Sequence, residues 1–157
     1  MKIEVKQNEL MNAINVASKA VSKNTNIQIH ELIYFEAKED RLLLTAFDGE
    51  ITILTSIPAL VKEEGEMAVK ANLFSGIIRK LPNDTVKIEI KDGKINIKSQ
   101  NSNFNLIAFE YFEKQDLTLP DSQPIEIAND KLKRSILQTE FATCLLYTSP
   151  SPRDQRG

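Results

Sequence analysis

The chain has 157 residues, of which 41% are hydrophobic and 27% charged, and its formal net charge is -2 at pH 7. This composition is typical of a globular protein that is long enough to bury a core, and it excludes a disordered chain or a membrane-spanning one. The first residues are charged and lack the apolar segment of a signal peptide. Because Cys144 is the single cysteine, it cannot form an internal disulfide, and we expect a cytoplasmic protein without membrane contact.

The first 58 residues predict one strand, one helix and three further strands. Apolar and charged residues alternate over residues 1–6, which indicates a half-buried strand, and an amphipathic helix follows to about residue 21. Residues 22–26 are polar and have the composition of a loop. Strands are then expected at residues 32–37, 42–46 and 51–57, and Pro58 ends the last of them.

The segment that follows, to residue 106, repeats this order. Residues 62–66 are mostly acidic and are expected to form an exposed connection. A strand from residue 67 leads into a helix that ends near residue 81, and alternating apolar residues predict strands at 86–90, 95–97 and 104–106. Asp92-Gly93 is typical of a two-residue hairpin. The two strand-helix-three-strand units together predict an α+β domain with antiparallel sheets and helices on one face.

The junction of strand and helix occurs three times with one spacing of apolar residues. Counted from the last apolar strand residue, the positions +5, +8, +9 and +12 fall on one helix face, and a residue suited to capping lies at +3. This repetition indicates a duplicated architecture. The three sets are Val5, Asn8, Leu10, Ala13, Ile14 and Ala17; Val69, Asn72, Phe74, Ile77, Ile78 and Leu81; and Ile127, Asp130, Leu132, Ser135, Ile136 and Thr139.

The third junction is not followed by strands. Residues 113–124 contain two prolines among acidic and polar residues, which is typical of a linker between domains. A helix should run to about residue 143, and the remaining residues show no alternation. We therefore expect one domain over residues 1–120, the truncated start of a second over 121–143, and a tail over 144–157. That tail is either translated adapter sequence or a frameshifted natural terminus.

The charges are distributed unevenly between the expected helices and the rest of the chain. Residues 7–23, 70–81 and 129–141 hold eight basic and three acidic side chains, so the helices carry +5 and the remaining residues -7. Basic helices on an acidic sheet can create a positive surface for a polyanion. The alternative is that these are solubilising side chains placed near helix C-termini, where cations are favoured.

Residues 1–143 resemble the bacterial sliding clamp, the beta subunit of DNA polymerase III. The resemblance rests on residues 1–22, 31–53, 73–82 and 87–106, in the same order along the chain. It implies a DNA-clamp fold in which two three-domain subunits form a ring, with helices lining the channel and sheets outside. The implied function is a non-catalytic processivity factor that encircles double-stranded DNA without reading its sequence. DNA polymerase III and the clamp loader would be partners of the intact homodimer.

The resemblance also implies positions for contacts. Lys19, Lys23, Asn24, Arg79 and Lys80 would bind DNA phosphates from the channel side. A second set, near the edge that meets another subunit's third domain, consists of Ile77, Phe104 and Leu106. Core packing is the alternative role for these three residues, because their alternation suits either.

The sequence departs from the family pattern at two loops and at its end. Residues 28–30 read Gln-Ile-His where the family commonly has Pro-Ile-Leu, and residues 47–50 read Phe-Asp-Gly-Glu in place of Thr-Asp-Leu-Glu. Some members have an arginine at the position of Asn24. The family continues for two further domains, so a chain that stops here would lack the partner-peptide pocket and the domain that closes the ring, and we expect it to be a monomer.

No residues suggest an active site, a metal site or a cofactor. His30 is the single histidine, and Asp48 and Glu50 lie in a predicted turn without a partner base. Gly76 lies within a helix pattern and lacks the Gly-Lys-Ser/Thr sequence of a phosphate loop. We expect a protein that is not an enzyme. Two other functions stay open: a free-standing α+β protein-interaction module without DNA binding, and a fragment of an enzyme whose site lies elsewhere.

Overall fold

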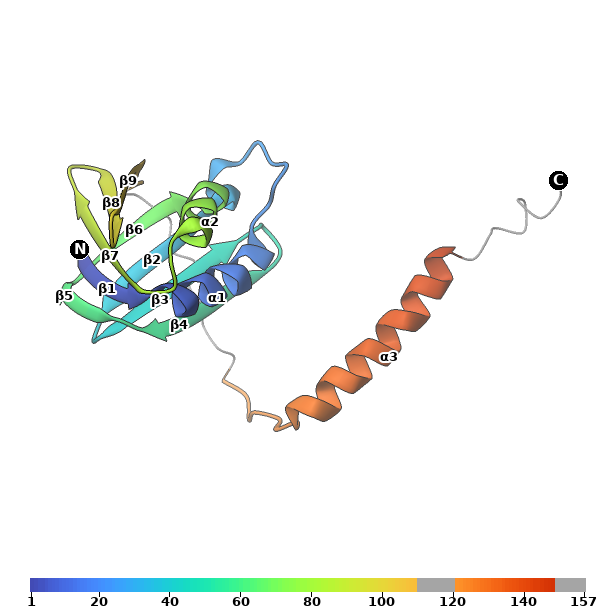
Figure 1. Cartoon of the computed structure of the whole chain (residues 1–157). Coiled ribbons are helices and arrows are strands. Elements are labelled where there is room, and N and C mark those ends of the chain that lie inside the picture. Colours follow the sequence, from blue (N-terminus) through green and yellow to red (C-terminus); the bar gives the residue numbers. More distant parts are fainter. Residues whose placement is uncertain (110–120, 149–157) are drawn as a thin grey trace. The chain divides into compact units, whose positions relative to one another are not determined.

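A computed structural model describes residues 1–109 and 121–148, and the chain divides into two units, Met1–Gln115 and Asp116–Gly157. Figure 1 shows the labelled elements. The first unit contains β1 (Lys2–Lys6), α1 (Gln7–Ala17), η1 (Ser18–Ala20), η2 (Gln28–Glu31), β2 (Leu32–Lys38), β3 (Arg41–Phe47), β4 (Thr52–Pro58), β5 (Leu60–Glu63), β6 (Gly65–Lys70), α2 (Ala71–Lys80), β7 (Thr85–Lys91), β8 (Lys94–Ser99) and β9 (Ser102–Ile107). The strand-helix-three-strand order therefore occurs twice, as predicted.

One predicted connection is wrong. Residues 62–66 were expected to form an exposed acidic loop, but most of them lie in β5 and β6. Residues Val61 and Glu63 of β5 pair with Ile3 and Lys2 of β1, so this segment forms the edge of a sheet. The strand was not predicted because its acidic residues do not alternate with apolar ones. An edge strand faces water on one side and needs few apolar residues.

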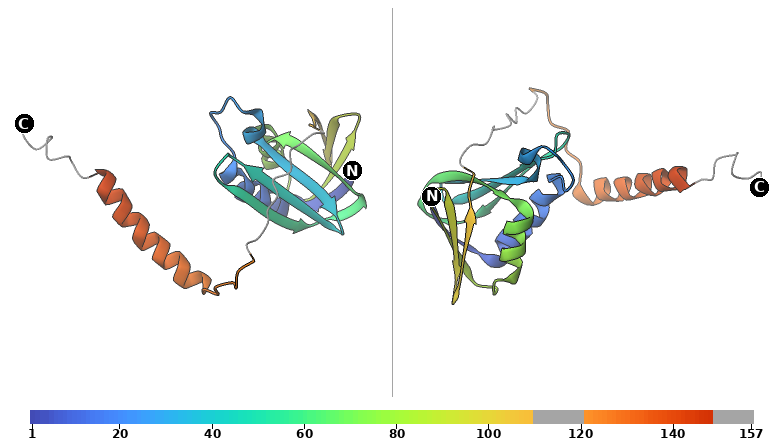
Figure 2. Two further views of the ribbon diagram at one scale, coloured as in Figure 1. Left: turned by 180° about the vertical axis from the view of Figure 1, so that it is seen from behind. Right: turned by 90° about the horizontal axis from the view of Figure 1, so that it is seen from above.

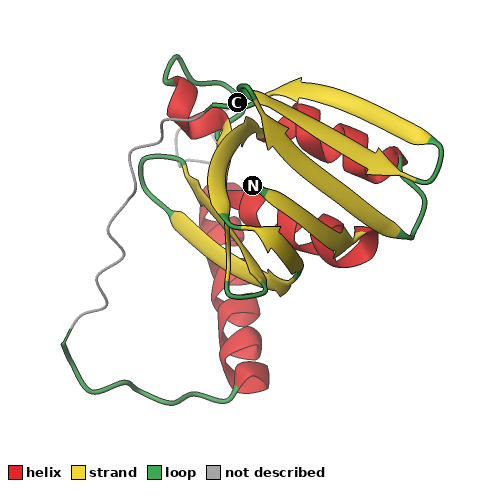
Figure 3. Ribbon diagram, turned by 90° about the vertical axis from the view of Figure 1, so that its left-hand side faces the viewer, coloured by secondary structure: helices red, strands yellow, loops and turns green. Residues whose placement is uncertain are grey.

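The strands form two antiparallel sheets (Figure 3). Each sheet contains one strand from the other half of the unit. The five-stranded sheet has the order β5-β1-β7-β8-β9, and the four-stranded sheet has the order β4-β3-β2-β6. Thus β1 pairs with β7, where Ile3 is opposite Ile88, and β6 pairs with β2, where Met67 is opposite Phe35. Neither half can form its sheet alone, so the duplication produces a single unit.

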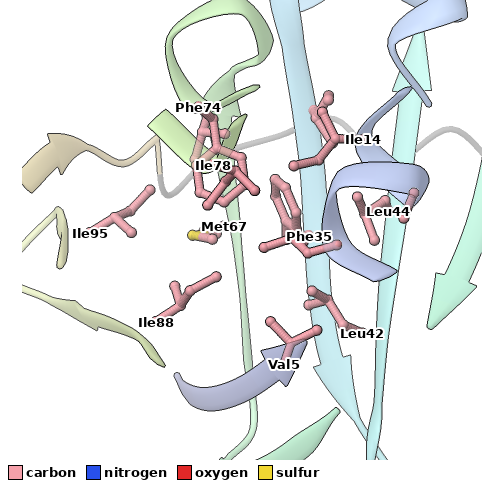
Figure 4. Close-up of a cluster of buried hydrophobic side chains, with 14 of the residues drawn as sticks. Val5, Ile14, Phe35, Leu42, Leu44, Met67, Phe74, Ile78, Ile88 and Ile95 are labelled. Carbon is pink, nitrogen blue, oxygen red and sulfur yellow. The ribbon is translucent and has the colours of Figure 1, made fainter. Parts of the chain in front are cut away.

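The core lies between the sheets and the two helices. Buried and more exposed residues alternate along β1, β3 and β8, whereas β2 and β6 are buried over several consecutive residues. The predicted stripes of α1 and α2 face the same interior. Figure 4 shows Phe74 and Ile78 of α2 close to Phe35 of β2, with Ile88 and Ile95 of the five-stranded sheet nearby. Of the predicted helix residues in this unit, those buried are Leu10, Ala13, Ile14, Ala17, Phe74, Ile78 and Leu81, whereas Ile77 is half-buried.

Two predicted hairpins are confirmed, one between β7 and β8 and one between β2 and β3. Asp92 and Gly93 have φ angles of 52° and 69°, the left-handed conformation required by a type I′ turn. Glu39 and Asp40, between β2 and β3, have φ angles of 51° and 56° without a glycine. The Asp40 main-chain oxygen accepts a hydrogen bond from the Ala59 N–H at 3.0 Å, which ties this turn to the β4–β5 junction.

The N-cap residues of the two helices lie two residues before the predicted capping residues. Lys6 and Lys70 are the residues that precede α1 and α2, and neither makes a side-chain capping bond. Asn8 and Asn72 instead lie within the first turn, where their Oδ1 atoms accept the N–H of Glu9 at 2.9 Å and of Leu73 at 2.8 Å. They therefore satisfy first-turn amides, as expected, although they are not the N-cap residues.

In the second unit the structure describes one helix, α3 (Asn129–Thr148). It extends beyond residue 143, where the sequence pattern predicted its end. Every side chain described over residues 121–143 is exposed, including those of Leu132 and Ile136. The predicted linker at 113–124 and the predicted tail at 144–157 lie partly outside the described residues.

Replacement of Phe74 by alanine should remove the centre of the core. Phe74 is fully buried, and its ring centroid lies 5.1 Å from that of Phe35. Loss of a buried phenyl group leaves a cavity and typically costs about 3–5 kcal/mol, which urea denaturation would measure for Phe74→Ala. The matched control is Leu73→Ala, because Leu73 is 53% exposed on the same helix. Equal losses in the two variants would contradict this description of the core.

Amide exchange should separate α3 from α2. Ile78 in α2 packs in the core, whereas Ile136 in α3 is 56% exposed, so α3 lacks the apolar contacts that protect a helix from local unfolding. We expect the amides of Leu132–Gln138 to exchange much faster than those of Ile77–Leu81 when hydrogen exchange is followed by NMR. Equal protection in both helices would show that α3 is packed in solution.

The Asp48 carboxylate in the turn between β3 and β4 should stabilise the protein at neutral pH but not in acid. Asp48 accepts the N–H of Ile51 at 2.8 Å and that of Glu50 at 2.9 Å, and these bonds lower its pKa. A carboxyl whose pKa is lower in the folded state stabilises the protein above its unfolded pKa, which is about 4, and this stability is lost as the pH falls further. Urea denaturation of Asp48→Asn should therefore show a weaker loss of stability from pH 5 to pH 2 than the parent protein shows. Identical pH profiles would refute this role.

Candidate nucleic-acid interface

The five residues expected to bind DNA lie at the ends of α1 and α2. Lys19 is in η1, directly after α1, and Lys23 and Asn24 are in the loop that follows. Arg79 and Lys80 form the last turn of α2. None of the five side chains is buried. Arg79 and Lys80 lie at the C-terminal end of α2 and Lys19 lies just after that of α1, where the partial negative charge of a helix favours cations.

The structure divides these residues into two groups because α1 and α2 run antiparallel (Figure 2). The Gln7 side-chain amide donates a hydrogen bond to the Ile78 main-chain oxygen at 2.9 Å, so α1 begins where α2 ends. Arg79 and Lys80, the helix-end group, thus lie near the start of α1. Lys19, Lys23 and Asn24, the loop group, lie at its other end. The 11 residues of α1 separate the two groups by about 16 Å along the helix axis.

Between the two groups, α1 presents a face of asparagine side chains to solvent. Asn8, Asn12, Asn15 and Lys19 follow one another at intervals of four, three and four residues, and all four are exposed. This spacing places them on the side of α1 opposite to its buried stripe. The prediction from sequence missed Asn12 and Asn15, although the complement of the apolar stripe would have identified them.

Three lysines of the five-stranded sheet pair with carboxylates, whereas the cations of the loop and helix-end groups make no ion pair within the described residues. On the five-stranded sheet, Lys2 lies 3.9 Å from Glu89, and Lys62 and Lys87 both pair with Glu4. The hydrogen bond from Lys62 is the main cause that lowers the pKa of Glu4, so this carboxylate is charged at neutral pH. Within residues 1–109 and 121–148, by contrast, no ion pair involves the four cations of the loop and helix-end groups. Their charge is available to an external anion.

The three residues expected at a subunit edge are half-buried. Ile77, Phe104 and Leu106 pack against the core, which agrees with the alternative role considered for them. The main chain of β9 still forms a free edge of the five-stranded sheet, because the strand pairings found among the described residues join β9 to β8 alone. Ile107, the last residue of β9, is 71% exposed.

The described residues offer little else for binding or chemistry. His30 packs edge-on against Phe47, with 5.4 Å between ring centroids. No group of three or more histidine, cysteine, aspartate or glutamate side chains is placed to hold a metal ion in the part of the chain that the structure describes. None of the helices in that part is long and apolar enough to cross a membrane.

Comparison with known proteins gives one consistent result. Residues 1–118 match the family described as DNA polymerase III beta subunit, N-terminal domain. The beta sliding clamp of Bacillus subtilis is 31% identical over 160 residues, a match that covers 96% of this chain and 42% of that protein. The clamp of Halalkalibacterium halodurans is 33% identical over 147 residues and covers 87% of this chain and 39% of that protein.

Solved structures agree with these relatives. The crystal structure of the DNA polymerase sliding clamp from Bacillus subtilis matches with a TM-score of 0.80 and 30% identity over 87% of this chain and 38% of that one. The Helicobacter pylori beta clamp bound to a DNA ligase peptide matches with a TM-score of 0.72 and 29% identity, over 77% and 34% of the two chains. The chain spans about two fifths of the length of its curated relatives. It belongs to the DNA polymerase III beta subunit family, the beta sliding clamps.

Proposed function

We propose that this chain supplies the DNA-facing surface of a sliding clamp, which encircles duplex DNA and holds the replicative polymerase at its template without any catalysis of its own. The observation that carries the proposal is the pair of basic groups without ion-pair partners in the described residues at the two ends of α1. A clamp must hold a polyanion without fixing its position. Free cations on a surface without catalytic groups suit that task, because phosphate contacts carry no sequence information.

The separation of the two groups suits a duplex. About 16 Å between them, the length of α1, is comparable to the major groove, which is about 12 Å wide between its rims. The loop group and the helix-end group would therefore contact phosphates on opposite rims. The amides of Asn12 and Asn15 would face the duplex between them and donate hydrogen bonds without adding charge. Such a surface binds any sequence, and its affinity depends on salt.

The remaining parts of the proposal concern assembly. Residues 1–120 would form the first domain, 121–143 the start of the next, and 144–157 a segment outside the clamp domains. The β9 edge, with Ile77, Phe104 and Leu106 beside it, would meet the third domain of another subunit in the intact homodimer. This chain by itself would be a monomer. DNA polymerase III and the clamp loader would bind the complete ring, and the DNA ligase peptide on the Helicobacter pylori clamp supports peptide binding by such rings.

Charge reversal at both groups should abolish DNA binding. In the variant with Lys19, Lys23, Arg79 and Lys80 all changed to glutamate, the phosphate contacts become repulsive. For the parent protein, four phosphate contacts predict that log K falls with log salt concentration with a slope of roughly -3 to -4. Fluorescence anisotropy of a short labelled duplex, titrated at several salt concentrations, would measure both effects.

The matched control carries the same change in net charge on strands and their ends. Lys38, Lys91, Lys94 and Lys98 are exposed on the sheets, and their replacement by glutamate should leave most of the DNA affinity. Thermal unfolding would confirm that both variants fold. If the helix variant binds DNA as well as the parent does, the proposed DNA surface is wrong and a protein-interaction module without DNA binding becomes the better explanation. Equal losses in the two variants would indicate attraction by net charge alone.

A further inference from the structure

The loop that carries Lys23 and Asn24 has few contacts that fix its position. None of the residues 21–31 is buried, and Ile27 is 53% exposed. The loop is closed by a hydrogen bond from the Ser22 N–H to the His30 main-chain oxygen at 2.8 Å. Val21 packs against the core where this segment begins, but no buried residue follows it, so the position of Lys23 depends on what holds His30.

The His30 side chain rests on the turn between β3 and β4. Its ring lies edge-on to that of Phe47, with an angle of 88° between the ring planes. It also covers Gly49, where an added Cβ would lie only 3.1 Å from the His30 Cε1 atom. Gly49 has a φ angle of +100°, so this position favours glycine for two reasons. The absence of a side chain at residue 49 leaves the space that the imidazole occupies.

The turn beneath His30 is itself held in place. The Asp48 carboxylate accepts the main-chain N–H groups of Glu50 and Ile51, and the Asp48 N–H bonds to the Ile51 oxygen at 3.3 Å. These bonds fix Phe47 and Gly49 relative to the sheet. The imidazole thus joins a loop with few contacts to an ordered turn. An ion pair between Glu31 and Lys70, at 3.6 Å, adds a second connection from η2 to the start of α2.

We propose that His30 is a positioning residue, which through its contact with Phe47 and Gly49 holds the loop group ready for phosphate contact. The proposal rests on the proposed DNA-binding function. A loop that is ordered before binding loses less conformational entropy when its side chains meet DNA. His30 itself need not touch the duplex. Its role is to keep Lys23 and Asn24 near the end of α1, beside Lys19.

A thermodynamic cycle tests this role in the whole chain. Anisotropy with a short labelled duplex would give the DNA affinity of His30→Ala, which we expect to be weaker than that of the parent by roughly threefold to tenfold, the effect of freeing one or two ordered side chains. His30→Phe keeps an aromatic edge against Phe47 and should restore most of the affinity. Gly49→Ala should also weaken binding, because its methyl group would lie 3.1 Å from the His30 Cε1 atom and its φ angle of +100° disfavours a side chain, so that the ring or the turn must shift.

The cycle also separates positioning from general loss of stability. In the His30→Ala background, Lys23→Ala should weaken binding less than it does in the parent, whereas the effect of Arg79→Ala should be the same in both. Independently of DNA, the amide of Ser22 should exchange faster in His30→Ala, while that of Ile14 should not.

The outcomes distinguish the two proposals. If Lys23→Ala and Arg79→Ala both weaken binding but the effects of His30→Ala and Lys23→Ala simply add, the positioning role is wrong and the DNA surface stands. Unchanged affinity in His30→Ala would likewise overturn the positioning role alone. If neither Lys23→Ala nor Arg79→Ala affects binding, the proposed function fails, and the role of His30 fails with it.

Discussion

The exchange of two strands between the sheets is the constraint on which the rest of the structure depends. β1, from the first strand-helix-three-strand half, pairs with β7 of the second, and β6, from the second half, pairs with β2 of the first. Both exchanged strands lead directly into a helix, so the exchange fixes where α1 and α2 begin. Because each sheet needs a strand from the other half, neither half can bury its apolar face without its partner. The two halves are therefore expected to fold in one cooperative step.

The same exchange explains why the candidate DNA surface has two basic groups rather than one. Two equivalent strand-helix units that meet in this way place their helices side by side in opposite directions, and the bond from Gln7 to Ile78 shows the result. Cations gather near the C-terminal end of each helix, where the partial negative charge of the helix favours them. An antiparallel pair separates those two ends by the length of a helix. A surface long enough to reach both rims of a groove thus follows from the duplication.

The sequence predicted the apolar stripes because their spacing is a direct consequence of helix geometry, and the buried Leu10, Ile14, Phe74 and Ile78 confirm it. It did not predict β5, whose few apolar residues resemble a loop until β1 is known to lie beside it. The capping residues were expected two positions too late, since Lys6 and Lys70 have no capping side chain to mark them. The location of the candidate residues near the C-terminal ends of α1 and α2 could be predicted, but their division into two groups could not. That division depends on the packing of two helices about 60 residues apart in the chain, which local patterns do not encode.

The contact between His30 and the β3–β4 turn joins the two loops whose sequences differ from what the clamp resemblance leads us to expect. Residues 28–30 and 47–50 lie apart along the chain, yet in the structure the His30 ring meets both Phe47 and Gly49. A side chain at residue 49 would crowd the imidazole, because its Cβ would lie 3.1 Å from the His30 Cε1 atom, and a smaller residue at position 30 would leave Phe47 without its aromatic neighbour. The residues found in the two loops therefore fit together. Loops vary among relatives more readily than sheets do, and a pair of changes that fit together allows a loop to vary while the side chains at its tip keep their position.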